Sequence, residues 1–486
     1  MSDKNKYNII WLQTDEHRCD SIGCYGSEWA ITPNLDRLAA RGVLFRNAYC
    51  QSPICSPSRA SQLTARYPQE INALSNLGAE LEGVFPEHTI TFPEVFASIG
   101  YETVNLGKSH TPAHQTWQQS SGPVIDPEVA TYANLHERFN EDDYDIIKRP
   151  GGPGIIIGGT YPEPDNNPCR ILTDQAIDFL KNRDDSNPLL LRVSYNWPHT
   201  PVLPPPPYDK IYDDTAIPVV YCNEKVFNER SCRDREIGER EKMWELDTSQ
   251  QQKVWRDYMA LAAYVDSEIG RLLDYLDNSS LRENTIILFS SDHGRNLGEW
   301  GAGEKCTFDD CSFRVPFIWS CPGLLPEGEE RNDVCELLDT AKTLLSLADC
   351  QKHIPVDFRG RNLFDITSEV DTFAIGQIGW PSLPYSIVPQ EIIGRYARCQ
   401  EGIPRYNLGT RLAIRYDRYK MDVEWIDDDQ RVPFSELDGN LFDLQTDPAE
   451  RHNLFSNPEY ADVVKKLLIL LDNKFSKLDF PLYQPK

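Results

Sequence analysis

The sequence predicts an α/β protein built on a mostly parallel sheet with helices on both faces. Three short runs rich in β-branched and aliphatic residues have the character of buried strands: residues 101–106, 189–195 and 285–290. Helical periodicity is clearest over residues 170–180 and 254–276. Because strands and helices alternate, we expect helices to cover both faces of the sheet and a cleft to run along one of its edges.

The pattern changes toward the C-terminus. Residues 410–424 alternate apolar and polar positions around a turn at Asp417-Arg418, which predicts an antiparallel hairpin. A terminal helix is expected over residues 460–478. We therefore predict two domains, a large α/β domain over residues 1–370 and a smaller C-terminal subdomain over residues 371–486.

Two long segments lack periodicity. Residues 115–168 and 201–250 are rich in Pro, Gly and charged residues. Long segments of this kind are functional loops or disordered chain. We expect loops that contribute to a binding site.

Composition agrees with a large soluble protein without a membrane span. Of 486 residues, 40% are hydrophobic, which is enough for a sizeable core, and the mean hydropathy is -0.50 with no long apolar run. The formal net charge of -26 argues against nucleic acid and anionic membrane surfaces as partners. An anionic substrate would be repelled at long range, so we expect a locally basic pocket that takes small substrates. A homo-oligomer is compatible with these features.

The N-terminus and the cysteines predict a cytoplasmic location. The first seven residues are polar and charged and lead directly into an apolar strand, without the apolar stretch of a secretory signal. Thirteen cysteines, an odd number without a repeating framework, fit a reducing compartment better than a disulfide scaffold.

The pentapeptide Cys55-Ser56-Pro57-Ser58-Arg59 carries the most specific signal for function. Cys55 lies just before a proline and a run that can begin a helix, so its sulfur would lie in the positive field of a helix N-terminus beside Arg59. Such a position suits an anion. The alternative is a buried structural cysteine at a helix start, because free cysteine is among the most buried residue types.

The pentapeptide resembles the Cys-x-Pro-Ser-Arg signature of type I sulfatases, members of the alkaline phosphatase superfamily whose cysteine is oxidised after translation to Cα-formylglycine. Other segments that resemble this family follow in its order along almost the whole chain: Asp15-Glu16-His17, Thr32-Pro33-Asn34, Gly107-Lys108-Ser109-His110, Trp197-Pro198-His199-Thr200-Pro201, Ser291-Asp292-His293-Gly294, Gly303-Glu304-Lys305 and Asn440-Leu441-Phe442-Asp443. The resemblance implies a large mixed, mostly parallel sheet sandwiched by helices, with a smaller C-terminal antiparallel sheet plus helix. It also implies a sulfuric ester hydrolase.

The resemblance assigns roles to the residues of these segments. Cys55, matured by a formylglycine-generating enzyme, would provide an aldehyde hydrate as the nucleophile. Arg59 would hold the hydrate, and Lys108 and Lys305 would neutralise the oxygens of a small sulfated substrate. Taken alone, each lysine would be read as a solvated surface charge.

Two histidines have separable roles under the same resemblance. His110 matches the histidine that helps to remove the proton of the second hydroxyl of the hydrate. His199 matches the one that faces the leaving oxygen, which makes it the expected general acid. Isolated histidines such as His17 are expected to be packing residues.

A divalent metal is implied, with Asp15, Glu16, Asp292, His293 and the modified Cys55 as ligands. The sequence departs from the commonest family pattern at two of these positions. Glu16 replaces the second of two adjacent aspartates, so it could ligate the metal or support a ligand. His293 stands where many members have asparagine. Calcium is the first choice, and the imidazole donor leaves manganese or magnesium open.

Two alternative functions remain at this stage. Phosphonate monoester and phosphodiester hydrolases of the same superfamily use the same formylglycine and an Asp plus Asp-His metal set. A non-catalytic binding protein with the same fold is the other alternative, although the intact set from Asp15 to Lys305 argues against it. We expect a sulfatase that acts on a sugar, aryl or alkyl sulfate monoester.

Overall fold

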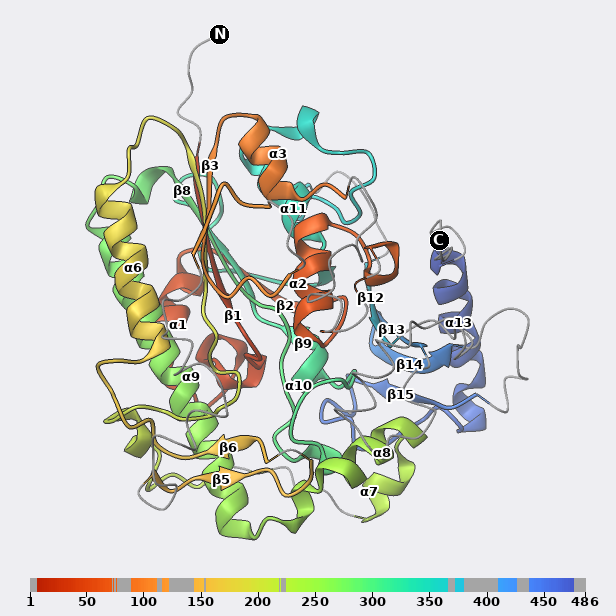
Figure 1. Cartoon of the computed structure of the whole chain (residues 1–486). Helices are drawn as coiled ribbons and strands as arrows, with labels where there is room; N and C mark the ends of the chain where they lie inside the picture. Colours follow the sequence, from red (N-terminus) through yellow and green to blue (C-terminus); the bar gives the residue numbers. More distant parts are fainter. Residues whose placement is uncertain are drawn as a thin grey trace, which may run out of the picture.

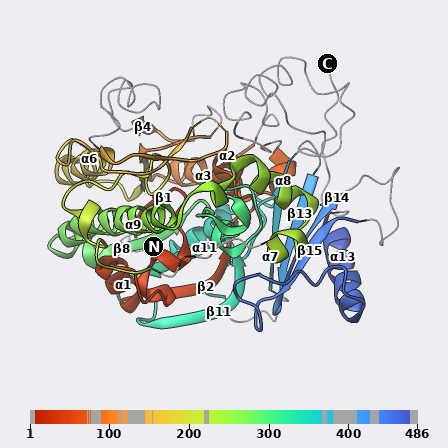
Figure 2. The same cartoon turned by 90° about the horizontal axis from the view of Figure 1, so that it is seen from below.

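A computed structural model describes residues 7–71, 73, 76, 89–111, 116–121, 144–152, 154–217, 219, 224–365, 372–379, 410–425 and 437–475. A large sheet packs between two layers of helices, and a smaller sheet lies beside it with the last helix of the chain (Figure 1 and Figure 2). The predicted α/β fold is therefore confirmed.

The large sheet has nine strands in the order β11-β2-β10-β8-β1-β7-β3-β4, with β9 paired to β2. At its centre, β1 (Asn8–Thr14) runs parallel to β7 (Leu189–Ser194) and to β8 (Thr285–Ser291). The other strands are β2 (Val43–Tyr49), β3 (Glu102–Gly107), β4 (Gln119–Ser121), β9 (Arg314–Val315), β10 (Phe317–Ser320) and β11 (Glu329–Glu336). Antiparallel pairing is confined to β9 and β10, so the sheet is mixed but mostly parallel, as predicted.

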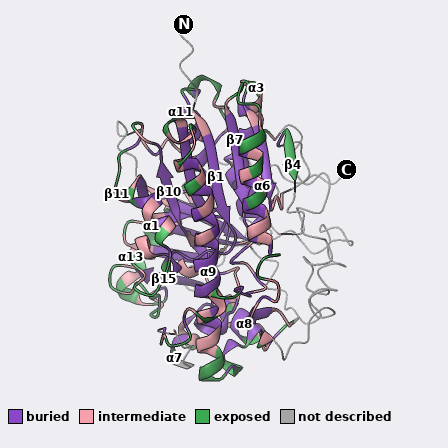
Figure 3. Cartoon of the chain, turned by 90° about the vertical axis from the view of Figure 1, so that its left-hand side faces the viewer, coloured by how far each residue is buried: buried purple, intermediate pink, exposed green. Residues whose placement is uncertain are grey.

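The alternation of side chains along β1 divides the core between the two faces of the sheet. Ile10 and Leu12 join one apolar cluster, which includes side chains of α1, α6 and α9, while Ile9 and Trp11 join a second, with side chains of α2, α3 and α11. These helices are α1 (Pro33–Ala40), α2 (Cys55–Thr64), α3 (Phe92–Ser98), α6 (Pro168–Asn182), α9 (Thr248–Asp277) and α11 (Asp339–Leu347). Figure 3 shows the central strands buried between the helical layers.

The two predicted long helices are confirmed, and both begin earlier than their apolar periodicity indicates. In α6 the side chain of Asn167 accepts hydrogen bonds from the backbone of Cys169 and Arg170. In α9 Asp247 and Gln250 form a capping box. These polar caps extend each helix beyond the residues that face the core.

The smaller sheet has four antiparallel strands, β12 (Phe373–Ile378), β13 (Thr410–Tyr416), β14 (Tyr419–Trp425) and β15 (Gly439–Asp443). The predicted hairpin is β13 and β14, and Asp417 in its turn has a left-handed backbone with φ 53°. Helix α13 (Ala461–Phe475) packs on this sheet through Val464, Leu467 and Leu471. The predicted domain boundary at residues 370 and 371 and the last part of the predicted helix lie outside the described residues.

The prediction that residues 201–250 form a loop is wrong in part. The segment contains α7 (Glu224–Glu229), α8 (Cys232–Glu241) and the start of α9. Helix α8 escapes detection because most of its residues are charged; it is capped by Ser231, and a buried ion pair joins Arg230 to its Asp234. Within 115–168, the described residues include the short strands β4, β5 (Ile147–Lys148) and β6 (Ile156–Gly158). Among the helices described, none is long and apolar enough to cross a membrane.

Candidate active site

Four of the predicted site residues follow two neighbouring parallel strands. Asp15 and Glu16 come directly after β1, and Asp292 and His293 come directly after β8. Thr14 lies opposite Ser291 in the register of these strands, so both pairs emerge at the same edge of the sheet. The carboxyl edge of a parallel sheet is the place where α/β proteins bind ligands.

Cys55 is the first residue of α2 and is fully buried. Its Sγ lies 3.0 Å from Nζ of Lys305, 3.2 Å from Nε2 of His293 and 3.9 Å from Nζ of Lys108. Asp15 Oδ1 lies 3.7 Å away. The side chain at position 55 is therefore the point on which the predicted site converges.

The surroundings of Cys55 favour an anion. Burial by itself would raise the pKa of the thiol, but the charges of Lys108, Lys305 and His293 and a hydrogen bond from His110 lower that pKa well below its ordinary value. The N-terminus of α2 adds positive field at the same point. This is the property that the sequence predicted for the pentapeptide.

Arg59, one turn further along α2, is fully buried and joins the two strand ends. Its Nη2 donates to Asp15 Oδ2 at 2.8 Å and its Nε donates to Asp292 Oδ2 at 2.7 Å. Lys108, which follows β3, contacts the same Asp15 oxygen at 2.6 Å. Burial and the Cys55 sulfur tend to raise the pKa of Asp15, but Lys108, His199 and Arg59 together lower it.

A group of donors at this point fits a divalent metal. The ligand atoms of Asp15, Cys55, Asp292 and His293 all lie within 4.8 Å of one another, and all four residues are buried. His293 Nδ1 lies 2.8 Å from Gly294 O, where it can only donate, so Nε2 is the nitrogen that faces the site and can ligate a metal once it gives up its proton. Two carboxylates and an imidazole held this close together are a suitable set for a hard or borderline cation.

Glu16 belongs to a second group of possible metal ligands, with Asp15 and His199. Its Oε1 lies 2.6 Å from Nζ of Lys305 and 3.4 Å from Nε2 of His199. The side chain of His199 is 21% exposed, and its Nε2 lies 3.3 Å from Nζ of Lys305. The more accessible side of the site is thus formed by an imidazole and an ammonium.

His110 follows Lys108 in the turn after β3 and has a left-handed backbone with φ 45°. Its Nδ1 is buried without a hydrogen-bond partner. The structure therefore brings every predicted catalytic and metal-binding residue to one place.

Sequence reasoning missed several buried polar residues behind the site. Gln13 on β1 and Ser194 on β7 accept hydrogen bonds from Arg59 Nη1, at 3.2 and 2.8 Å. Arg295 donates from Nη1 to Glu16 Oε2 at 2.9 Å. Polar residues inside or directly after apolar strands were the available signal, since such residues require partners once buried.

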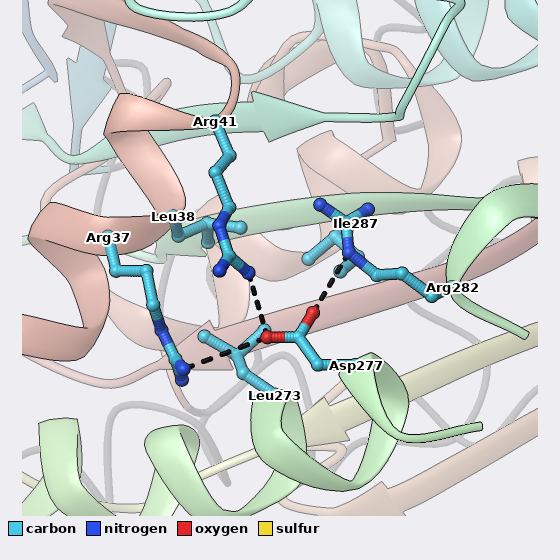
Figure 4. Close-up of a pocket in the computed structure, with 7 residues that line it drawn as sticks. All are labelled: Arg37, Leu38, Arg41, Leu273, Asp277, Arg282 and Ile287. Atoms are coloured by element: carbon cyan, nitrogen blue, oxygen red, sulfur yellow. Dashed lines mark hydrogen bonds and ion pairs between the residues drawn. The ribbon is translucent and has the colours of Figure 1, made fainter.

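A small pocket elsewhere does not belong to this site. It lies among α1, the end of α9 and the first half of β8, where Arg41 and Arg282 contact Asp277 at 2.7 and 2.9 Å (Figure 4). Ile287 lines it, four positions before the end of β8 at Ser291, so the pocket lies away from the carboxyl edge.

Comparisons with known proteins agree on one family. The family model named Sulfatase matches residues 7–350. The chain is 26% identical to N-acetylglucosamine-6-O-sulfatase of Bacteroides thetaiotaomicron, over 96% of this chain and 85% of the relative, and 27% identical to human iduronate 2-sulfatase, over 95% and 93%.

Solved structures share the fold over the full length. One is a protein in complex with its substrate D-glucosamine-2-N,6-O-disulfate, with a TM-score of 0.70, 22% identity and coverage of 99% of this chain and 100% of the other. Another is a phosphonate monoester hydrolase from Silicibacter pomeroyi, with a TM-score of 0.75, 20% identity and coverage of 98% and 96%.

Proposed function

Because the chain belongs to the sulfatase family and is therefore a sulfuric ester hydrolase, we propose that it cleaves sulfate monoesters of sugars through a formylglycine formed from Cys55. The observation that carries this proposal is the position of Cys55 Sγ, at the head of α2 and between Lys305 and His293. An oxygen that replaces this sulfur would stand among the same cations.

An unmodified thiolate cannot complete the reaction, because attack on sulfur would leave a stable thiosulfate. Maturation oxidises the CH2–SH group of Cys55 to an aldehyde: the co-substrate oxidant of the maturation enzyme takes up two electrons, water supplies the carbonyl oxygen, and the sulfur leaves as hydrogen sulfide. The hydrated aldehyde offers two hydroxyls: one forms the bond to sulfur as the alcohol leaves, and deprotonation of the other breaks the C–O bond to sulfate and restores the aldehyde.

The surrounding residues have the positions that this reaction needs. Arg59 fixes Asp15 and Asp292 from behind. Lys108 and Lys305 approach Cys55 from two sides and can neutralise sulfate oxygens.

The two histidines complete the proposed proton transfers. His199, on the accessible side, is the general acid for the leaving alcohol. His110 is the group that takes the proton of the second hydroxyl, and its hydrogen bond to the position of Cys55 supports this role.

Asp15, Asp292, His293 and the modified Cys55 would hold a divalent metal, for which calcium is the first choice. The ion would polarise the sulfate and stabilise charge on its oxygens. Manganese and magnesium remain alternatives because one donor is an imidazole.

The names of two relatives support a sugar sulfate as the substrate: N-acetylglucosamine-6-O-sulfatase from a bacterium and iduronate 2-sulfatase from human. An arylsulfatase of Clostridium perfringens, 27% identical, keeps an aryl sulfate as the alternative. The net charge of -26 favours a small saccharide over a long polyanion. The cytoplasmic location and a homo-oligomer stay predictions from the sequence.

Phosphonate monoester hydrolysis is the second candidate. The fold of the Silicibacter pomeroyi hydrolase is similar at a TM-score of 0.75, and the Asp292-His293 pair fits that class as well. The sulfatase family match over residues 7–350 favours the first candidate.

The maturation state of Cys55 can be tested directly. We expect the peptide that contains residues 51–59, from protein coexpressed with a formylglycine-generating enzyme, to carry the aldehyde or its hydrate by mass spectrometry. Activity on an aryl sulfate should rise with the modified fraction, and Cys55→Ala should be inactive. Full activity in protein that carries only the thiol would contradict the proposal.

A further inference from the structure

Glu16 is held by cations on both of its carboxylate oxygens. The residue is buried, with 1% of its surface exposed, and has a left-handed backbone with φ 58°. Its Oε2 accepts from Arg295 and its Oε1 accepts from Lys305, at 2.9 and 2.6 Å. The carboxylate of Glu16 therefore bridges Arg295 and Lys305.

Arg295 has no exposed surface, and Glu16 is the carboxylate that pairs with it within the described part of the chain. Its Nη2 donates to Gly303 O at 2.5 Å. The next residue, Asn296, donates from its backbone and side chain to Glu304 O, at 2.5 and 2.7 Å. These hydrogen bonds fix the backbone of Gly303 and Glu304, the two residues that immediately precede Lys305.

This arrangement fixes Glu16 and Lys305 relative to each other. Removal of the partner of a buried guanidinium strongly destabilises a protein. The pairing therefore restricts both Glu16 and Arg295 to these side-chain conformations. The carboxylate of Glu16 therefore lies between the cationic groups of Arg295 and Lys305, with the imidazole of His199 beside it.

Two contacts orient the imidazole of His199. Its Nδ1 lies 2.5 Å from the carbonyl oxygen of Thr200, to which it can only donate. Nε2 is therefore the nitrogen that exchanges a proton with the leaving group, and Glu16 Oε1 lies 3.4 Å from it. The carboxylate can stabilise the imidazolium in the orientation from which it donates.

We propose that Arg295 is a positioning residue, which holds Glu16 against Lys305 and His199 so that Glu16 orients these two groups and does not ligate the metal. The proposal rests on the proposed sulfatase reaction and on two observations about Glu16. Glu16 lies outside the donor group of Asp15, Cys55, Asp292 and His293. In the second group of possible ligands, which it forms with Asp15 and His199, both of its oxygens already accept from Arg295 and Lys305.

Metal affinity separates this role from that of a ligand. We expect Glu16→Gln and Arg295→Met to change the dissociation constant of Ca²⁺, measured by calorimetry on the purified protein, by less than about threefold, because no donor is lost. Asp292→Asn is the positive control and should weaken binding by about 100-fold or more. If Glu16→Gln weakens Ca²⁺ binding as much as Asp292→Asn does, Glu16 is a ligand and the proposal is wrong.

Leaving-group dependence supplies the second readout. Glu16→Gln and Arg295→Met should each lower kcat for a sugar or alkyl sulfate by about 10- to 100-fold, and kcat for an activated aryl sulfate by less than about fivefold, since only the poor leaving group needs strong acid assistance. Arg411→Met removes a buried arginine that pairs with Asp422 in the smaller sheet, and should leave the ratio of the two kcat values unchanged. Equal losses on both substrates would overturn the proposal.

The double variant Glu16→Gln/Arg295→Met guards against simple misfolding, because it removes both buried charges together. If Arg295 acts through Glu16, the double variant should lose no more activity on the sugar sulfate than Glu16→Gln alone. Losses that multiply would show that Arg295 acts independently. The calcium measurement does not depend on substrate, so it decides the role of Glu16 even if sulfate esters are not turned over.

Discussion

Replacement of Arg59 by methionine removes a buried guanidinium that pairs with two carboxylates at the ends of β1 and β8. Asp15 keeps Lys108 at 2.6 Å, whereas Asp292 keeps the backbone N–H groups of His293 and Glu16, at 2.9 and 3.3 Å, and a longer contact of 3.8 Å with Nε2 of His293. Most of the loss therefore falls on Asp292.

The size of the effect follows from burial. Both carboxylates and Arg59 have no exposed side-chain surface, and the loss of one partner from such a pair costs about 3–5 kcal/mol. A divalent metal bound by Asp15 and Asp292 would supply positive charge at the same place. The destabilisation should accordingly be largest in metal-free protein and smaller in saturating Ca²⁺.

Urea unfolding followed by tryptophan fluorescence, with EDTA and with Ca²⁺, measures both quantities. Arg41→Met is the matched control: it removes an arginine that contacts Asp277 at 2.7 Å with 42% of its side chain exposed (Figure 4), so it should cost about 0–1 kcal/mol in either buffer. If Arg59→Met destabilises the metal-free protein no more than this control, or equally with and without Ca²⁺, the assignment of Arg59 is refuted.

Three further changes have defined outcomes. Asp292→Ala should abolish calcium binding and turnover with an unchanged circular dichroism spectrum; turnover that survives chelation would contradict this. His199→Ala should lower kcat by about 100-fold for a sugar sulfate but by less than tenfold for an activated aryl sulfate, and a uniform loss would exclude it as the acid. Burial, assisted by Asp339, raises the pKa of Glu336 from 4.5 to about 7, so the folded state favours its protonated form and loses about 3 kcal/mol of stability as the pH rises through this range. Glu336→Gln should lack this loss when unfolding is compared at pH 5 and pH 8, and an unchanged pH dependence would show that the loss arises elsewhere.

The elements that the sequence predicted best are those whose side chains face the core. The strands β1, β7 and β8 are apolar on both faces because both faces are covered, and α9 shows a clear apolar period for the same reason. Helix α8 and the strand β11 have no such pattern. The first part of β11 consists of charged and polar residues that alternate between exposed and half-buried. The positions of both elements depend on ion pairs and on neighbouring strands, which local periodicity does not reveal.

The site could be predicted as far as the family motifs extend. Cys55, Lys108, His199 and Asp292 come from four separate segments, and only the resemblance indicated that they would meet. Arg295 follows one of these motifs directly but carries no motif of its own. Its partner Glu16 lies 279 positions away in the sequence, so the pairing becomes visible only when β1 and β8 are placed side by side.

The central claim, that this site hydrolyses sulfate esters, is tested most directly by the ratio of kcat/KM for matched sulfate and phosphonate substrates on the matured enzyme. A sulfate monoester carries a single charge and leaves as an alcohol, which His199 can protonate. We predict a higher kcat/KM for a sulfated sugar and for phenyl sulfate than for the matched phenyl phosphonate or phosphodiester. A preference for the phosphonate would contradict the claim and assign the enzyme to phosphonate hydrolysis.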